Sequence, residues 1–215
     1  MSAFPGSPRL VKGGLVLVDW TSGAVQRVIA MQYNPDSLSR TLQIQAVKEG
    51  GDRSEAMRLT GAPNETIKVD AEIDATDQLE LSDATAIDVG IQPQLAALET
   101  IVYPASSQVL QNYQLAQSGT LEIDPMLAPL TLFVWSKTRV LPVRVTDFSI
   151  TEEAFDPTLN PIRAKVSLGM RVLNTNDLGF DNQGGNLFMA YHQQKERLAA
   201  MSQSGSLNVL GIGGV

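Results

Sequence analysis

Strict alternation of apolar and charged residues is the feature that most constrains the fold of this chain. In residues 67–74 the two kinds of side chain alternate without a break: Ile67, Val69, Ala71 and Ile73 are apolar, and Lys68, Asp70, Glu72 and Asp74 are charged. Because a β-strand places successive side chains on opposite faces, this segment predicts a strand with one buried face and one face in water.

The same period of two recurs along the chain and predicts a mainly β protein with a few helices. Further strands are expected at residues 15–20, 25–31, 41–46, 130–135, 140–150 and 164–172. Helical spacing is confined to three places, residues 93–102, 106–116 and 186–202. Pro93 suits a first helical turn, and Ser106 and Asn186 are expected as N-caps.

Composition excludes several function classes. The 215 residues include no cysteine and one histidine, so neither thiol chemistry nor a histidine-built metal centre is expected. The net charge of −7 argues against a nucleic-acid partner. No apolar run reaches the roughly 18 residues of a membrane span, and the first residues lack a signal-peptide pattern. We therefore expect synthesis in the cytoplasm and no membrane insertion.

Three groups of titratable residues are candidates for chemical sites. The row Asp70, Glu72 and Asp74 can either share a cation or form a solvated strand face, and the second reading is favoured. The acidic cluster Glu152, Glu153 and Asp156 suggests either a glycosidase pair or a surface turn, and the turn is favoured. His192 sits in a polar helical run and is read as a surface residue. No enzyme activity, metal or cofactor is expected.

Two turn motifs are more specific. The first is Tyr33-Asn34-Pro35, where the proline forces a turn because it keeps the preceding residue out of the helical region. The second begins with Trp135 and continues as a hairpin whose bend is Phe155-Asp156-Pro157 and whose return strand enters through Pro161, Arg163 and Ala164. We expect Arg163 to pair with Asp156 across this bend and hold the register of the hairpin.

These two motifs resemble those of the tube-protein family of contractile injection systems, in particular its tube–baseplate adaptor members. The matching positions are Tyr33, Asn34, Pro35, Trp135, Phe155, Asp156, Pro161, Arg163 and Ala164. The resemblance implies a phage tail-tube-like split β-barrel, assembled as a homohexameric ring that joins the spike and baseplate hub to the inner tube and initiates tube assembly. Its implied partners are other copies of itself, the inner-tube protein and the spike, hub and other baseplate proteins of a phage tail-like particle. The alternatives are an inner-tube subunit, a tube terminator ring, or a protein that binds or hydrolyses cell-wall carbohydrate.

The resemblance divides the chain into an N-terminal arm (1–13), a barrel (14–175) with a helical insertion at about 76–127, and a C-terminal helix with an extended tail (176–215). Many adaptor relatives carry a LysM module after the barrel, and none fits into residues 176–215. The tail is apolar and uncharged, and Leu207, Val209, Leu210 and Ile212 need a surface to cover them. It is predicted either to pair with a neighbouring chain by strand addition or to fray. The polar face of residues 67–73 is expected to line the channel or to face outward.

Overall fold

The computed structural model describes residues 11–20, 22–46, 58–119 and 128–202. Its framework is one seven-stranded sheet in the order β2-β1-β5-β6-β7-β4-β3, in which all neighbours are antiparallel. The strands are β1 (Gly14–Val18), β2 (Val25–Ala30), β3 (Leu38–Gln43), β4 (Asn64–Asp74), β5 (Leu130–Ser136), β6 (Arg139–Glu152) and β7 (Arg163–Val172). The prediction of a mainly β protein is confirmed.

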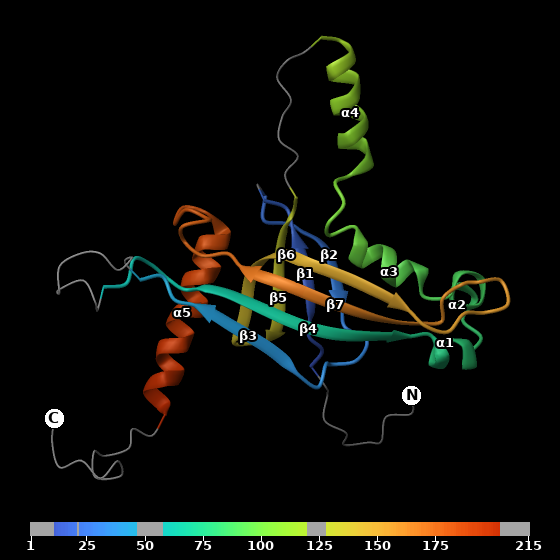
Figure 1. Ribbon diagram of the computed structural model, residues 1–215, viewed down its shortest axis with the longest axis horizontal. Coiled ribbons are helices and arrows are strands. Elements are labelled where there is room, and N and C mark those ends of the chain that lie inside the picture. Colours follow the sequence, from blue (N-terminus) through green and yellow to red (C-terminus); the bar gives the residue numbers. More distant parts are fainter. Residues whose placement is uncertain (1–10, 21, 47–57, 120–127, 203–215) are drawn as a thin grey trace.

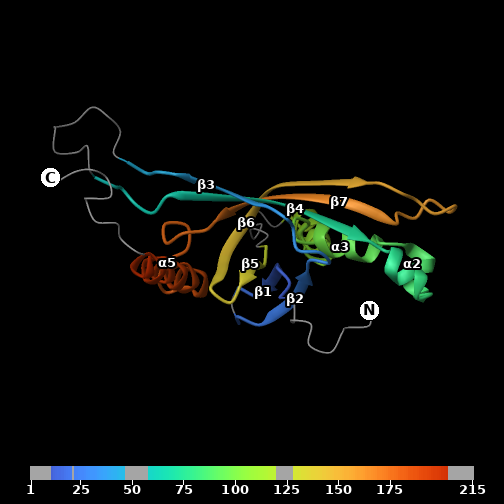
Figure 2. The ribbon, with the colours of Figure 1, turned by 90° about the horizontal axis from the view of Figure 1, so that it is seen from below.

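Strand β6 belongs to both halves of the sheet. Its first residues pair with β5, and from Val143 onward it pairs with β7. A register shift between Val145 and Asp147 accompanies this change of partner. Figure 2 shows the result: β3, β4, β7 and the end of β6 form one layer, and β1, β2 and β5 lie to one side of it. The order of the described strands ends at β2 and β3, so a closed split barrel is not confirmed.

The core lies between these two parts of the sheet. Phe133, Leu141, Ile67 and Met170 are each fully buried in it. Strand β4 follows its sequence pattern, since Ile67, Val69 and Ile73 are buried whereas Lys68, Asp70 and Glu72 are exposed. The predicted amphipathic strand is therefore present, and it is longer than residues 67–74.

Five helices accompany the sheet in the described part of the chain: α1 (Thr76–Glu80), α2 (Ala84–Val89), α3 (Gln92–Glu99), α4 (Ser106–Gln117) and α5 (Gln183–Met201). All three predicted helical segments are helical. The prediction that helices are confined to those segments is wrong, because α1 and α2 are also present. They have five and six residues, too short for a helical period to show in the sequence. The side chain of Asp83 caps α2 by accepting a hydrogen bond from Ala86 N.

Several predicted boundaries also need correction. Helix α5 is capped by Asn182, whose side chain accepts from Gly184 N, and the expected cap Asn186 lies inside the first turn. Ser106 is the first residue of α4, and the cap position belongs to Ala105. The third strand, expected at residues 41–46, runs from Leu38 to Gln43, and Ala46 makes only an isolated bridge to Leu59.

Candidate assembly surface

The aromatic-Asn-Pro turn attaches the start of β1 to the connection between β2 and β3. The Asn34 side chain accepts a hydrogen bond from Gly13 N (3.0 Å) and donates one to Val11 O (2.9 Å). Met31 N also donates to Gly13 O (2.9 Å). Asn34 therefore has a structural role, and Pro35 after it is half-buried. Tyr33 is 46% exposed and is the residue of this motif available to a partner.

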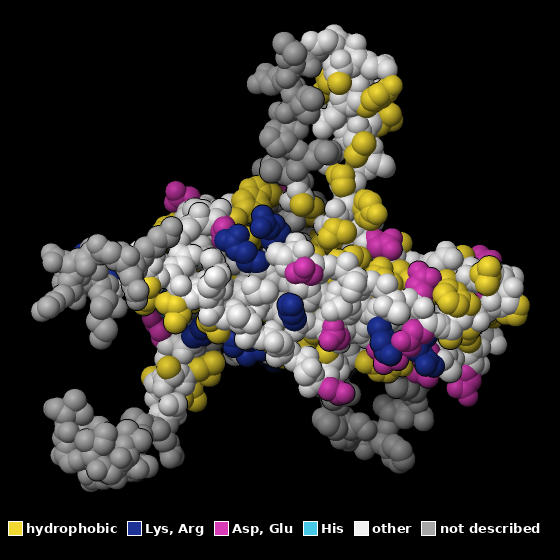
Figure 3. All heavy atoms as spheres, viewed as in Figure 1, with side chains coloured by type: hydrophobic (Ala, Val, Ile, Leu, Met, Phe, Trp, Pro, Cys, Tyr) yellow, Lys and Arg dark blue, Asp and Glu magenta, His cyan; other side chains and the backbone are white. Residues whose placement is uncertain are grey.

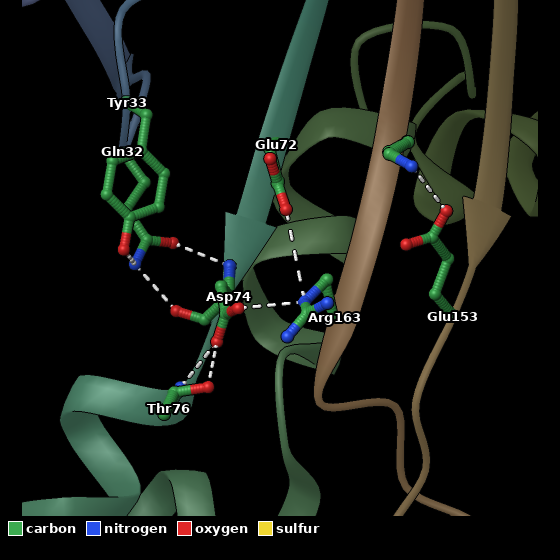
Figure 4. Close-up of polar contacts among 8 residues, drawn as sticks. Gln32, Tyr33, Glu72, Asp74, Thr76, Glu153 and Arg163 are labelled. Atoms are coloured by element: carbon green, nitrogen blue, oxygen red, sulfur yellow. Dashed lines mark hydrogen bonds and ion pairs between the residues drawn. The ribbon is translucent and has the colours of Figure 1, made fainter.

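The residue before this turn joins it to the end of β4. The Gln32 amide donates to Asp74 O (2.6 Å) and accepts from Asp74 N (3.0 Å), as a backbone strand neighbour would do. Figure 4 shows Gln32 facing the end of β4. Sequence reasoning missed Gln32, since no periodic signal marks a glutamine that substitutes for a strand.

Arg163 pairs with Asp74, and the expected pair with Asp156 is wrong. Arg163 Nε lies 2.9 Å from Asp74 Oδ2 and 3.9 Å from Glu72 Oε1 (Figure 4). The register explains this, because Arg163 of β7 stands directly opposite Asp74 of β4. Burial alone would raise the pKa of Asp74, but hydrogen bonds from Thr76 and Arg163 outweigh it and lower that pKa.

Asp156 instead organises its own loop between β6 and β7. Its Oδ1 accepts from the backbone amides of Thr158 and Asn160, each at 2.8 Å, and its Oδ2 accepts from the Asn160 side chain at 2.9 Å. Desolvation alone would raise the pKa of Asp156, but these hydrogen bonds outweigh it and lower that pKa. An aspartate that bonds the backbone two and four residues ahead stabilises a tight turn.

This loop is docked on α2 and α3. Asn160 Nδ2 donates to Asp88 O (2.9 Å), and Ile91 N donates to Pro161 O (2.9 Å). Gly90 has φ +61°, and a Cβ there would overlap the Pro161 carbonyl oxygen. Only glycine combines this backbone conformation with so close an approach. The docked loop holds Phe155, 50% exposed, and Leu159, 77% exposed, in water.

The two remaining motif residues lie away from the loop surface. Ala164 is fully buried at the start of β7, opposite Ile73. Trp135 is half-buried on β5, with its ring centroid 5.8 Å from that of Phe133. The Trp135 ring also lies against Gly13, so it contacts the segment that Asn34 binds. The predicted site residues thus divide into residues that support the fold and two exposed aromatic side chains, those of Tyr33 and Phe155.

The comparisons with known proteins fit this pattern of motifs. A model of the contractile injection system tube protein family matches residues 19–178, which include both turn motifs. The chain belongs to this family. Among the solved structures that match is the tail of an empty GTA particle from helical refinement with C6 symmetry. It is 14% identical, with a TM-score of 0.28, and the match covers 74% of this chain and 90% of that chain. No curated protein matches.

Another network that sequence reasoning missed attaches helix α5 to the sheet. Glu65 on β4 is 3% exposed, and its carboxylate lies 2.7 Å from Arg40 Nε and 2.9 Å from Lys195 Nζ. The Tyr191 hydroxyl lies 3.1 Å from the same carboxylate, and the Lys195 ammonium lies 4.1 Å from the Tyr191 ring centroid. Burial would raise the pKa of Glu65, but Lys195 and Arg40 outweigh it and lower that pKa. The sequence does contain a signal for this network. Glu65 is a charged residue at a position where the alternation of β4 places apolar side chains.

The layer formed by β3, β4, β7 and the end of β6, which we call the front layer, has a polar face that gathers charged residues. Figure 3 views this face, where basic and acidic side chains are interspersed among polar ones. The charged residues on the paired strands are Lys68, Asp70, Glu72 and Asp74 of β4, Arg163, Lys165 and Arg171 of β7, and Arg144 and Asp147 of β6. Positive and negative charges are interspersed on this face, and the predicted acidic row has basic neighbours across the sheet, since Asp74 stands opposite Arg163. Glu72 stands opposite Lys165.

The other candidate chemical sites are solvent-facing side chains. Glu153 lies 2.8 Å from Lys165 Nζ, and this contact raises the pKa of Lys165. His192 is half exposed on α5, 3.5 Å from Glu196. Within the described residues no group of three or more His, Asp or Glu side chains is placed to hold a metal ion. Likewise, none of the helices there has the length and apolar character to cross a membrane. The tail residues Leu207, Val209, Leu210 and Ile212 lie outside the described part of the chain.

Proposed function

We propose that this tube-family subunit forms a hexameric ring that joins the spike and baseplate hub to the inner tube and initiates tube assembly. The family establishes a structural component of the tube of a contractile injection system. The ring, its hexameric state and its place at the baseplate belong to the proposal. Incorporation into a phage tail-like particle follows from it.

The observation that carries the proposal is that the front layer is open at both sides. On one side, β3 pairs only with β4 among the described strands. On the other, residues 147–152 of β6 pair only with β7 within the same described set. Unpaired strand edges expose rows of N–H and C=O groups that invite pairing with another chain. Two different edges on one subunit support head-to-tail contacts, which produce a ring when the rotation closes.

In this ring the polar face lines the channel. The opposite face of the layer is covered by β1, β2, β5 and helices α3 and α5, as Figure 2 shows, so the polar face is the one left for the lumen. A lining on which positive and negative charges are interspersed neither traps nor repels a passing cargo strongly. A Ser167→Cys variant tests this in a chain without native cysteine. Ser167 stands opposite Asp70 on the polar face. In assembled particles the thiol introduced at position 167 should react with a small maleimide but not with a maleimide carrying a large polymer, whereas Leu81→Cys, at a 76% exposed position, should react with both.

Helix α4 supports a place at the baseplate over a role as the repeated tube subunit. It projects from the sheet in Figure 1, and none of its residues is buried. Val109, Leu110 and Tyr113 occupy one side of it and are between 47% and 60% exposed. Helix α4 therefore gives the ring an apolar surface, beyond its own strands, for contact with another component. An inner-tube subunit and a terminator ring are the alternatives, and copy number separates the repeated tube subunit from the adaptor.

Electron microscopy of particles tests the proposal. A strain that lacks this protein should yield no full-length tubes on its baseplates, and wild-type particles should contain one or two rings of it. Dozens of copies stacked along the tube would instead identify the repeated tube subunit. Normal tubes and normal particle yield in the deletion strain would overturn the proposal.

A further inference from the structure

A groove lies between the edge strand β2 and helix α3. Its volume is about 560 Å³, and its main lining residues are Ile29, Met31, Ile73, Gln94, Ala97 and Leu98. We call it the β2–α3 groove. Strand β2 forms one wall, α3 the other, and the core-facing side chains at the end of β4 contribute to the floor. The lining is mostly apolar, so the groove suits an apolar chain segment.

Two features of the groove are incomplete in the isolated subunit. Strand β2 stands at the end of the sheet order, and among the described strands it pairs only with β1. Its other edge therefore offers backbone donors and acceptors beside the groove. In addition, Gln94 Oε1 is buried without a hydrogen-bond partner among the described residues. A donor from an incoming chain would relieve this buried acceptor of the free-energy cost that an unsatisfied group carries.

We propose that the C-terminal tail of a second copy, residues 203–215, binds in the β2–α3 groove by adding a strand to the free edge of β2. This inference rests on the proposed ring, which brings copies side by side. The tail contains neither charge nor proline, so it can donate along a ladder and enter an apolar groove. Residues 1–10 fit less well, because Pro5 and Pro8 cannot donate and Arg9 is charged.

The position of α5 favours a tail from a neighbouring copy. Lys195 of α5 is bound to Glu65 at the start of β4, whereas Ile73 in the groove lies at its end. Roughly eight residues of strand separate these points, which is about 26 Å. In Figure 1 the last turns of α5 point away from α3. Helix α5 thus ends in a direction that does not lead to the β2–α3 groove of its own subunit.

Cross-linking between two differently tagged full-length chains tests the inference. One chain carries Val28→Cys on β2 and the other carries Val209→Cys in the tail, and the two are mixed under assembly conditions. A short bis-maleimide should join them, because Val28 is 64% exposed on the edge strand. Leu81→Cys is the matched control, since Leu81 is 76% exposed but lies outside the groove. An excess of a synthetic peptide of residues 203–215 should lower the Val28 product at least about fivefold, which is a difference of roughly 1 kcal/mol or more in binding.

A pair of substitutions on one helix adds specificity. Ala97→Trp fills the groove and should lower the cross-link yield to a similar extent. Ala96→Trp, on the exposed side of α3, should leave it unchanged. Equal yields at Val28 and Leu81, or linkage only within a single chain carrying both Val28→Cys and Val209→Cys, would overturn the inference. Mass photometry of the same samples separates the two proposals, because rings without the cross-link refute the tail contact alone, whereas absence of rings refutes the proposed function.

Discussion

Each end of strand β4 carries a carboxylate that is stabilised by basic side chains, but the two carboxylates lie in different surroundings. Glu65, at the start, is almost completely buried and binds cations from β3 and α5. Asp74, at the other end, lies near the surface, where it binds Arg163 and Thr76 and its backbone binds Gln32. The buried network attaches a helix to the sheet, whereas the outer one sets the shape of neighbouring turns. Removing the Glu65 network should lower the free energy of unfolding. Altering the Asp74 network should mainly change the exposed surface around it.

The largest effect is expected from Glu65→Gln. It leaves the positive charges of Arg40 and Lys195 without their buried partner, and it should lower the free energy of unfolding by about 2–4 kcal/mol. Hydrogen exchange should show faster opening of α5 than of β7. Urea unfolding gives the magnitude, with Glu196→Gln as control because Glu196 is exposed on the same helix. If both variants unfold alike, Glu65 is not the anchor of α5.

A smaller loss of unfolding free energy is expected from Gly90→Ala, where the β6–β7 loop docks on α2 and α3. The new methyl group meets the Pro161 carbonyl oxygen at a positive φ, which should cost about 1–3 kcal/mol. Gly119→Ala is the matched control, since Gly119 also has a positive φ but nothing lies within 4 Å of the point that a Cβ would occupy there. The difference between the two unfolding free energies isolates the docking of the β6–β7 loop. Equal losses would mean that the close approach contributes nothing.

Acid should weaken both ends of β4. The pKa of Glu65 and that of Asp74 are lowered in the folded protein, so their contributions are complete above the unfolded values near pH ~4. These contributions are lost as pH falls through the lowered folded values. Urea midpoints measured across the acid range should therefore fall below about pH 4. The decline should be shallower in Glu65→Gln, and an unchanged slope would remove Glu65 from the account.

The smallest change in stability is expected from Arg163→Ala. Its partners Asp74 and Glu72 lie on the polar face, where solvent screens the pair, so the melting temperature should shift only slightly. The shift should disappear in the Asp74→Asn background and persist in the Asp156→Asn background. The reverse pattern in this double-mutant cycle would restore the pairing expected from the sequence.

The alternating pattern predicted much of the sheet because burial on one face leaves a period of two in the sequence. Residues 67–74 show this, and the strand occurs where the pattern places it. The pattern does not report which strand lies opposite which, so the partner of Arg163 could not be found from it. Asp156 is closer to Arg163 in sequence, but β4 brings Asp74 into the opposing position from 89 residues away.

The short helices and the buried Glu65 network were not predicted from the sequence for a different reason. Helix α2 has a side-chain cap from Asp83 and α1 has none, and each packs on the core through one residue, Leu79 of α1 and Ala86 of α2, rather than through an amphipathic period. Glu65 interrupts an apolar face, which is a visible anomaly, but its partners come from residues 40 and 195. The motif residues gave the family correctly, and their geometry shows that most of them support the fold.

The mass of the assembled protein tests the central claim most directly. Native mass spectrometry of the full-length chain, at the lowest concentration that preserves assembly, should give a species of six 23.2 kDa subunits, and negative-stain images of that species should show rings. Substituting Thr41 on the β3 edge by proline should remove it, because proline cannot donate to a neighbouring strand. A stable monomer across the whole concentration range, alone and with the other tube and baseplate components, would contradict the account.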